Sequence, residues 1–75
     1  MRLREAFPDN LRKLLKAECK RSGTDVANLC RRYGFEKKKL YMYMRGDSVP
    51  NLTTAYQLSK LLHCDINDFL EGVNE

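Results

Sequence analysis

Apolar residues recur along the chain at the spacing of α-helices. In residues 10–21, three leucines and a cysteine fall on one face of a helical wheel, and three lysines fall on the opposite face. Helical spacing continues through residues 26–33, 37–45, 52–62 and 66–70. No stretch alternates convincingly in the two-residue period of a strand. The pattern predicts an all-α fold class with five short helices.

Capping residues mark the ends of the predicted helices. Small polar residues that favour N-cap positions precede four of the helices: Asp9, Asp25, Asn51 and Asp65. Asp68, three residues after Asp65, resembles the second member of a capping box. Glycines, which adopt the left-handed conformation easily, follow three helices: Gly23, Gly34 and Gly46. His63 and Cys64 follow the fourth helix.

Pro8 precedes the first predicted helix, so residues 1–8 are expected to form an N-terminal arm. Residues 9–71 would form the domain and residues 72–75 a frayed tail. Only three residues, 34–36, separate the second helix from the third. So short a joint forces a steep crossing, which is the helix-turn-helix geometry.

Helix wheels divide each segment into a core face and a solvent face. In the second helix the predicted inner residues are Val26, Leu29, Cys30 and Tyr33. In the fourth helix they are Leu52, Ala55, Tyr56, Leu58, Ser59, Leu61 and Leu62. In the third helix, Leu40, Tyr43 and Met44 fall at i, i+3 and i+4 and would face the core.

Charge is distributed unevenly between the two parts of the chain. The net charge of +4 combines +8 in residues 1–45 with −4 in residues 46–75. A basic face of this kind suits a polyanion, most often nucleic acid. The alternative is an excess of lysine and arginine on a solvated surface, since these residues are mostly exposed anyway.

The outer face of the third helix combines the chemistry expected of a base-reading helix. Four residues would meet base edges in a major groove: Lys37, Lys38, Tyr41 and Met42. Lysine donates to guanine O6 and N7, and an apolar side chain can touch a thymine methyl group. Candidates for phosphate contacts are Thr24, Arg31, Arg32, Lys39, Arg45 and Asn51. The alternative for the lysine triplet is that it only solubilises a surface helix.

From Leu11 to Leu70 the chain resembles the Cro/cI-type (Xre-like) helix-turn-helix family of phage and bacterial regulators. The matching landmarks are Leu29-Cys30, Gly34, Leu40, Arg45-Gly46, Pro50-Asn51-Leu52, Leu58-Ser59-Lys60-Leu61-Leu62 and Ile66 through Leu70. No single landmark is specific, but their joint order and spacing are. The resemblance implies a compact five-helix lambda-repressor-like DNA-binding domain that binds operator DNA as a dimer.

The sequence departs from this family at several positions. The family usually pairs an arginine late in helix one with a glutamate before the stop glycine, and here those positions are Cys19 and Met44. Replacing both partners of a buried pair together is a coherent exchange. Val26 replaces a glutamine that contacts a phosphate in the family. Glu36 and Asp47, at the two ends of the third helix, would face DNA with negative charge.

Other classes of function find little support in the sequence. Arg45-Gly46-Asp47 could display a receptor-binding tripeptide, but Gly46 is needed to end a helix and nothing indicates secretion. The three cysteines lack the close spacing of metal ligands. A single histidine and no glycine-rich phosphate loop predict no enzyme, no cofactor and no small-molecule ligand. The first ten residues lack an apolar signal core and no apolar run could span a bilayer, so we expect a cytoplasmic protein and no membrane partner.

Two hypotheses about function remain. The first is a sequence-specific transcriptional regulator, a Cro-like repressor that binds a palindromic operator in double-stranded DNA as a homodimer. The second is a helix-turn-helix module for protein contact, such as an antirepressor or antitoxin-like partner. The predicted dimer interface comprises Ile66, Phe69, Leu70 and Val73, although these residues could instead close the core.

Overall fold

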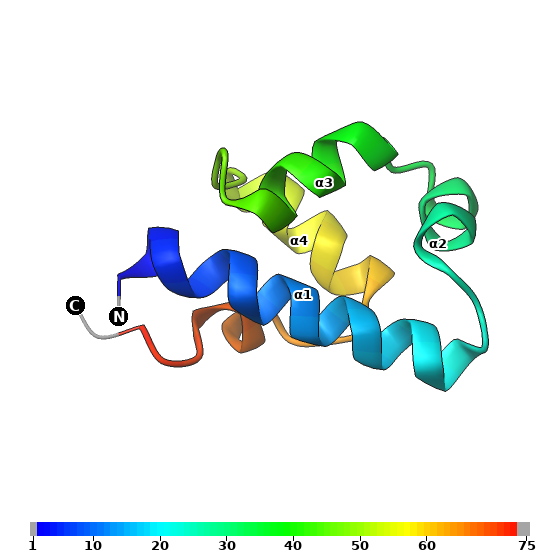
Figure 1. The fold of residues 1–75 in the computed structure, drawn as a ribbon, viewed down its shortest axis with the longest axis horizontal. Coiled ribbons are helices and arrows are strands. Elements are labelled where there is room, and N and C mark those ends of the chain that lie inside the picture. Colours follow the sequence, from blue (N-terminus) through cyan, green and yellow to red (C-terminus); the bar gives the residue numbers. More distant parts are fainter. Residues whose placement is uncertain (1, 74–75) are drawn as a thin grey trace.

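In the computed structural model, residues 2–73 are described, and they fold into four α-helices followed by a 3-10 helix (Figure 1). The helices are α1 (Leu3–Ser22), α2 (Val26–Tyr33), α3 (Lys37–Arg45), α4 (Leu52–Leu61) and the 3-10 helix η1 (Ile66–Leu70). No strand occurs among the described residues. The all-α fold class is therefore confirmed, with a short 3-10 helix where a fifth α-helix was expected. Residues 74 and 75 of the predicted tail lie outside the described residues.

Helix α1 begins much earlier than the sequence predicted, and the expected start near Asn10 is wrong. The helix begins at Leu3, and Pro8 lies inside it. Proline removes one hydrogen bond of the helical ladder, but Phe7 is only 2% exposed and packs on Phe69 with 5.3 Å between ring centroids. Burying an aromatic ring stabilises by about 1.5–3 kcal/mol, which offsets the lost bond. Residues 3–8 are thus part of a helix rather than of an arm.

The predicted boundaries of α2 are confirmed by the geometry of its caps. Asp25 Oδ1 accepts a hydrogen bond from the backbone N–H of Asn28 at 2.8 Å, and Gly34 ends the helix with a left-handed φ of 66°. Residues 34–36 then join α2 to α3. The chain changes direction within this short joint, and α3 does not continue the course of α2, as Figure 1 shows.

Helix α3 ends at Gly46, as predicted, and two features of this position favour glycine. Its φ of 82° is unfavourable for other residues, and a Cβ atom built there would lie 3.3 Å from Cγ of Pro8. The end of α3 therefore approaches the first turns of α1 closely. Arg12 of α1 also donates a hydrogen bond to the carbonyl oxygen of Met44.

Both predicted caps in the second half of the chain are confirmed. Asn51 Oδ1 accepts from the backbone N–H of Thr54 at 2.8 Å and caps α4. Asp65 and Asp68 form the reciprocal capping box of η1. Between the two elements, His63 adopts a positive φ of 53°. The chain turns sharply there and brings η1 back against α1.

One hydrophobic core joins all five elements. Its fully or nearly fully buried members are Phe7, Leu11, Leu15, Leu29, Cys30, Leu40, Tyr43, Leu58, Leu61, Leu62 and Phe69. Cys19 and Met44 are partly buried and pack against this core, as expected for apolar replacements of a charged pair.

Three residues predicted for the core are exposed instead. Leu52 is 78% exposed, Tyr56 55% and Tyr33 42%. The wheel of an isolated helix identifies an apolar face, but the neighbouring elements cover only part of it. Leu52 and Tyr56 lie one turn apart on α4, on a stretch of surface that the described residues leave open to solvent.

Hydrogen bonds tie the two ends of the domain together. Asn10 Nδ2 donates to the carbonyl oxygens of Phe69 and Glu71 at 2.9 and 2.8 Å. The result is a compact domain with a radius of gyration of 11.5 Å. Within residues 2–73, none of the helices combines the length and the apolar character needed to cross a membrane.

Candidate nucleic-acid interface

Helix α3 lies along one edge of the domain, with α1 and α4 on its inner side (Figure 1). Two side chains anchor it: Leu40 is fully buried and Tyr43 is 6% exposed. Met44 adds a partly buried contact to the core. These positions follow the predicted i, i+3, i+4 spacing, so the inner face of α3 is confirmed. The opposite face of the helix is open to solvent.

All the predicted base-reading residues lie on or beside this open face. Lys37, Lys38 and Tyr41 are exposed, and Met42 is half-buried. The three lysines, Lys37 to Lys39, form no salt bridge with any described carboxylate. They project from the first turn of α3, where Glu36 occupies the N-cap without a side-chain hydrogen bond. The start of α3 therefore carries three lysines without an ion-pair partner, next to the single acid Glu36.

Arg45, at the other end of α3, pairs with an acid in this structure. Its Nη2 atom lies 2.9 Å from Oδ2 of Asp47, and its Nε atom donates to the same oxygen at 3.0 Å. The aspartate that the sequence placed near DNA thus neutralises the last cation of α3. Positive charge on this helix is concentrated at its N-terminal end.

The remaining candidates for phosphate contacts differ in availability. Arg32 and Lys39 are exposed, and Arg31 Nη1 makes a long hydrogen bond of 3.4 Å to Asn28 Oδ1. Thr24 is half-buried in the turn before α2. Asn51 is exposed but uses its side-chain oxygen to cap α4, which leaves its amide N–H₂ group to donate.

The predicted dimer interface divides into buried and exposed members. Phe69 is 1% exposed and belongs to the core, so the alternative that it closes the core holds for this residue. Ile66 and Val73 are half-buried, and Leu70 is 44% exposed. A pocket of about 310 Å³ opens next to Leu70, and Leu52 lines it on the α4 side. Its other lining residues are Leu3, Phe7, Val49, Pro50, Ala55, Ile66 and Phe69.

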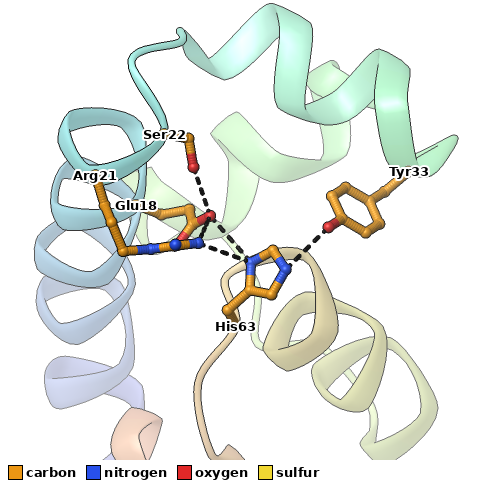
Figure 2. Close-up of polar contacts among 5 residues, drawn as sticks. All are labelled: Glu18, Arg21, Ser22, Tyr33 and His63. Atoms are coloured by element: carbon orange, nitrogen blue, oxygen red, sulfur yellow. Dashed lines mark hydrogen bonds and ion pairs between the residues drawn. The ribbon is translucent and has the colours of Figure 1, made fainter.

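A polar cluster that the sequence interpretation missed lies where α1, α2 and the turn after α4 meet (Figure 2). At its centre is Glu18, whose carboxylate is 3% exposed. Arg21 donates to Oε1 at 3.1 Å and to Oε2 at 2.6 Å, and Ser22 donates to Oε2 at 2.9 Å. His63 Nδ1 lies 3.0 Å from the same oxygen. These partners replace the water that a buried carboxylate loses.

The hydrogen bond from Arg21, more than any other contact, lowers the pKa of Glu18 from its ordinary value, although burial acts in the opposite direction. A sequence signal for this cluster exists. Glu18 follows Leu11 and Leu15 at i+7 and i+3, so it lies on the apolar face of α1. A carboxylate on such a face indicates buried partners. His63, distant in sequence, has no such signal.

The three cysteines are free thiols, and burial is the main cause that raises the pKa of each one. In the part of the chain that the structure describes, no three histidine, cysteine, aspartate or glutamate residues are grouped to hold a metal ion.

Comparison of the chain with protein-family models, with curated protein sequences and with solved structures gave no match.

Proposed function

We propose that this protein is a sequence-specific DNA-binding regulator of the Cro type. Helices α2 and α3 would act as a helix-turn-helix, with α3 in the major groove. A dimer would bind a palindromic operator and repress transcription by occupying it. The landmarks that resemble the Cro/cI-type family support this proposal, since they occur in order from α2 to η1.

One observation carries the proposal. Lys37, Lys38 and Lys39 are exposed, have no acidic partner among residues 2–73, and lie at the start of a helix whose other face is fixed to the core. A lysine that only solubilises a surface has no need of a rigid support. Base reading does need one, because side chains must be held in register with base edges.

The residues of α3 would divide the recognition between them. Lys37 and Lys38 would donate to guanine O6 and N7, and Met42 would contact a thymine methyl group. Tyr41 would reach a base edge or a phosphate. Lys39, with Arg31 and Arg32 of α2, would contact phosphates and so fix the register of the domain on the duplex.

Selection of bound sequences from a random pool of duplex DNA tests the proposal most directly. The expected result is a palindromic consensus whose half-sites lie about 34 Å apart, one helical turn of DNA. Affinity for the selected site should fall steeply as salt is raised, because each phosphate contact releases counterions. Failure of the intact protein to bind any duplex at low salt would exclude the regulator hypothesis.

A protein-contact module is the second candidate, and the pairing of Arg45 with Asp47 favours it. That pair removes a cation from the helix that would bind DNA. The apolar pocket beside Leu52 and Leu70 offers a surface on which a protein could dock. Under this hypothesis the random-pool selection would yield no consensus, and a Leu52→Asp variant would lose its protein partner.

A further inference from the structure

Two groups face Nδ1 of His63, and they favour opposite positions of its proton (Figure 2). The pKa of Glu18 is lowered, so at neutral pH its carboxylate only accepts hydrogen bonds, and Oε2 at 3.0 Å favours a hydrogen on Nδ1. Arg21 only donates, and its Nη2 atom at 3.3 Å favours a bare Nδ1. Because the contact with Glu18 is the shorter one, we assign the hydrogen to Nδ1.

In the neutral imidazole with its hydrogen on Nδ1, the Nε2 atom is an acceptor. The hydroxyl of Tyr33 lies 3.2 Å from Nε2, so in this tautomer it is placed to donate to the imidazole. A buried carboxylate, an imidazole and a hydroxyl thus stand in a row. In this arrangement the carboxylate can orient the imidazole, and the imidazole can remove the proton of the hydroxyl, as in enzymes with a nucleophilic side chain.

We propose that Tyr33 is a nucleophilic phenol that accepts an acyl group from activated esters, with His63 as its general base and Glu18 as the positioning residue of that base. The hydroxyl is within reach of a donor, since Tyr33 is 42% exposed. A hollow of about 200 Å³ opens beside it, lined also by Gln57 and Lys60. The amide can stabilise negative charge on the oxygen of a reacting carbonyl, whereas the ammonium group of Lys60 lies over the ring of Tyr56, 5.1 Å from its centroid.

The reaction is balanced without any further reagent. Oη of Tyr33 attacks the ester carbonyl carbon while its proton passes to Nε2 of His63. A new Oη–C bond forms, the bond from carbon to the leaving oxygen breaks, and the leaving group departs with the electron pair. The imidazolium, hydrogen-bonded to Glu18 through Nδ1, then returns the proton to the leaving group or to water. The product is an acyl ester of Tyr33.

The chain supplies its own controls for this proposal. Tyr41 and Tyr56 are 39% and 55% exposed, comparable with Tyr33, and neither has a hydrogen bond to an imidazole. Any probe meets all three phenols in one molecule, in one buffer and at one concentration. The ratio of their rates therefore reports the effect of His63 and cancels differences between preparations.

The experiment treats the folded protein with 4-nitrophenyl acetate and measures acetylation of each tyrosine by peptide mass spectrometry over time. Hydroxylamine, which cleaves phenyl esters but not amides, separates acetyl-tyrosine from acetyl-lysine. General-base assistance contributes on the order of a hundredfold or more, so Tyr33 should react faster than Tyr41 and Tyr56 by about that factor. Equal rates at the three tyrosines would overturn the proposal.

Two variants complete the test. His63→Asn removes the base, and asparagine tolerates the positive φ at this position, so Tyr33 should then react as slowly as Tyr41. Tyr33→Phe should abolish the fast acetylation, and the acetylation rates of Tyr41 and Tyr56 should stay unchanged. A fast phase at Tyr33 that survives His63→Asn would also overturn the proposal. If the histidine variant does not fold, the ratio of acetylation rates between Tyr33 and the two control tyrosines in the unaltered protein decides whether Tyr33 is activated. This acetylation assay contains no DNA, so its outcome does not depend on whether the protein binds DNA.

Discussion

Arg45 and Asp47 form an ion pair across Gly46, with 2.9 Å between Nη2 and Oδ2. Both side chains are more than half exposed, so the pair adds little to folding stability. The pair holds the last cation of α3 against an acid, so this end of the helix carries less net positive charge than its start.

The Asp47→Asn variant should bind DNA more tightly than the unaltered protein. The substitution removes a negative charge and releases Arg45 to contact a phosphate. One additional phosphate contact should steepen the slope of log affinity against log salt by about one. Fluorescence anisotropy over a series of salt concentrations measures both quantities. Glu71→Gln, which removes the same charge from an exposed residue beyond η1, is the matched control, and an equal gain there would rule out the local explanation.

The Lys38→Ala variant should lose discrimination between the selected operator and a mutated one. If Lys38 reads a base, the loss is roughly 1–3 kcal/mol and is confined to one position of the site. Competition binding with single-position operator variants measures it. Lys16→Ala is the control, because Lys16 is exposed on α1 on the face opposite its buried leucines. A uniform loss across all sequences would assign Lys38 to a phosphate instead.

Acid should destabilise the domain through Glu18. Hydrogen bonding from Arg21 lowers the pKa of Glu18 in the folded protein below the ordinary value of 4.5. A depressed pKa means stability that is present above pH 4.5 and is lost as pH falls through the folded pKa. Urea unfolding between about pH 7 and about pH 3 should show this loss.

The Glu18→Gln variant should be less stable at neutral pH by roughly 1.5–3 kcal/mol, the range for hydrogen bonds to charged groups. The difference from the unaltered protein should shrink as pH falls below 4.5 and through the lowered pKa of Glu18, where the folded protein also loses the charge of its carboxylate. Glu5→Gln, an exposed change on the same helix, should leave the pH dependence intact. A Glu18→Gln difference that stays constant with pH would contradict this account.

Phe7→Ala should destabilise the domain by about 3–5 kcal/mol, because it leaves a cavity against Phe69. Total stability for a domain of this size is about 4–11 kcal/mol, so the loss is a large fraction of it. Chemical denaturation monitored by circular dichroism measures the change. Leu52→Ala is the control, since Leu52 is 78% exposed. A negligible loss at Phe7 would mean that residues 3–8 behave as the arm that the sequence predicted.

Cys64 should resist alkylation in the folded protein. Burial, followed by the nearby charges of Asp68, Asp65 and Glu18, raises the pKa of its thiol to about 11. At about pH 8 only on the order of one thiol in a thousand is then ionised, and the thiolate is the reactive form. Iodoacetamide labelling read by mass spectrometry should be slow when folded and fast in urea. Rapid labelling of the folded protein would show that Cys64 is accessible and ionised.

Local signals explain how much of this fold was predictable. Asp25, Asn51 and the Asp65–Asp68 box cap their helices through contacts within a few residues, which a sequence displays directly. The predicted inner face of α3 was correct for Leu40 and Tyr43, because these two apolar residues lie three positions apart and so share one side of the helix.

The errors come from contacts between distant segments. Pro8 signals a helix boundary locally, but the burial of Phe7 against Phe69 outweighs it, and that contact joins residues 62 positions apart. The hydrogen bond between Glu18 and His63 spans 45 positions. On the candidate site, the sequence identified the exposed lysines of α3 but not that Asp47 would pair with Arg45.

The bonds from Asn10 to the carbonyl oxygens of Phe69 and Glu71 have a consequence for the order of folding. Helix α1 is the first described element to leave the ribosome, yet Phe7 meets its partner Phe69 only after η1 has been synthesised. Phe7 therefore lacks this contact through most of the synthesis of the described residues. Closure across so many residues also raises the entropic cost of the folding transition state, so the domain should fold more slowly than its helix content alone would suggest.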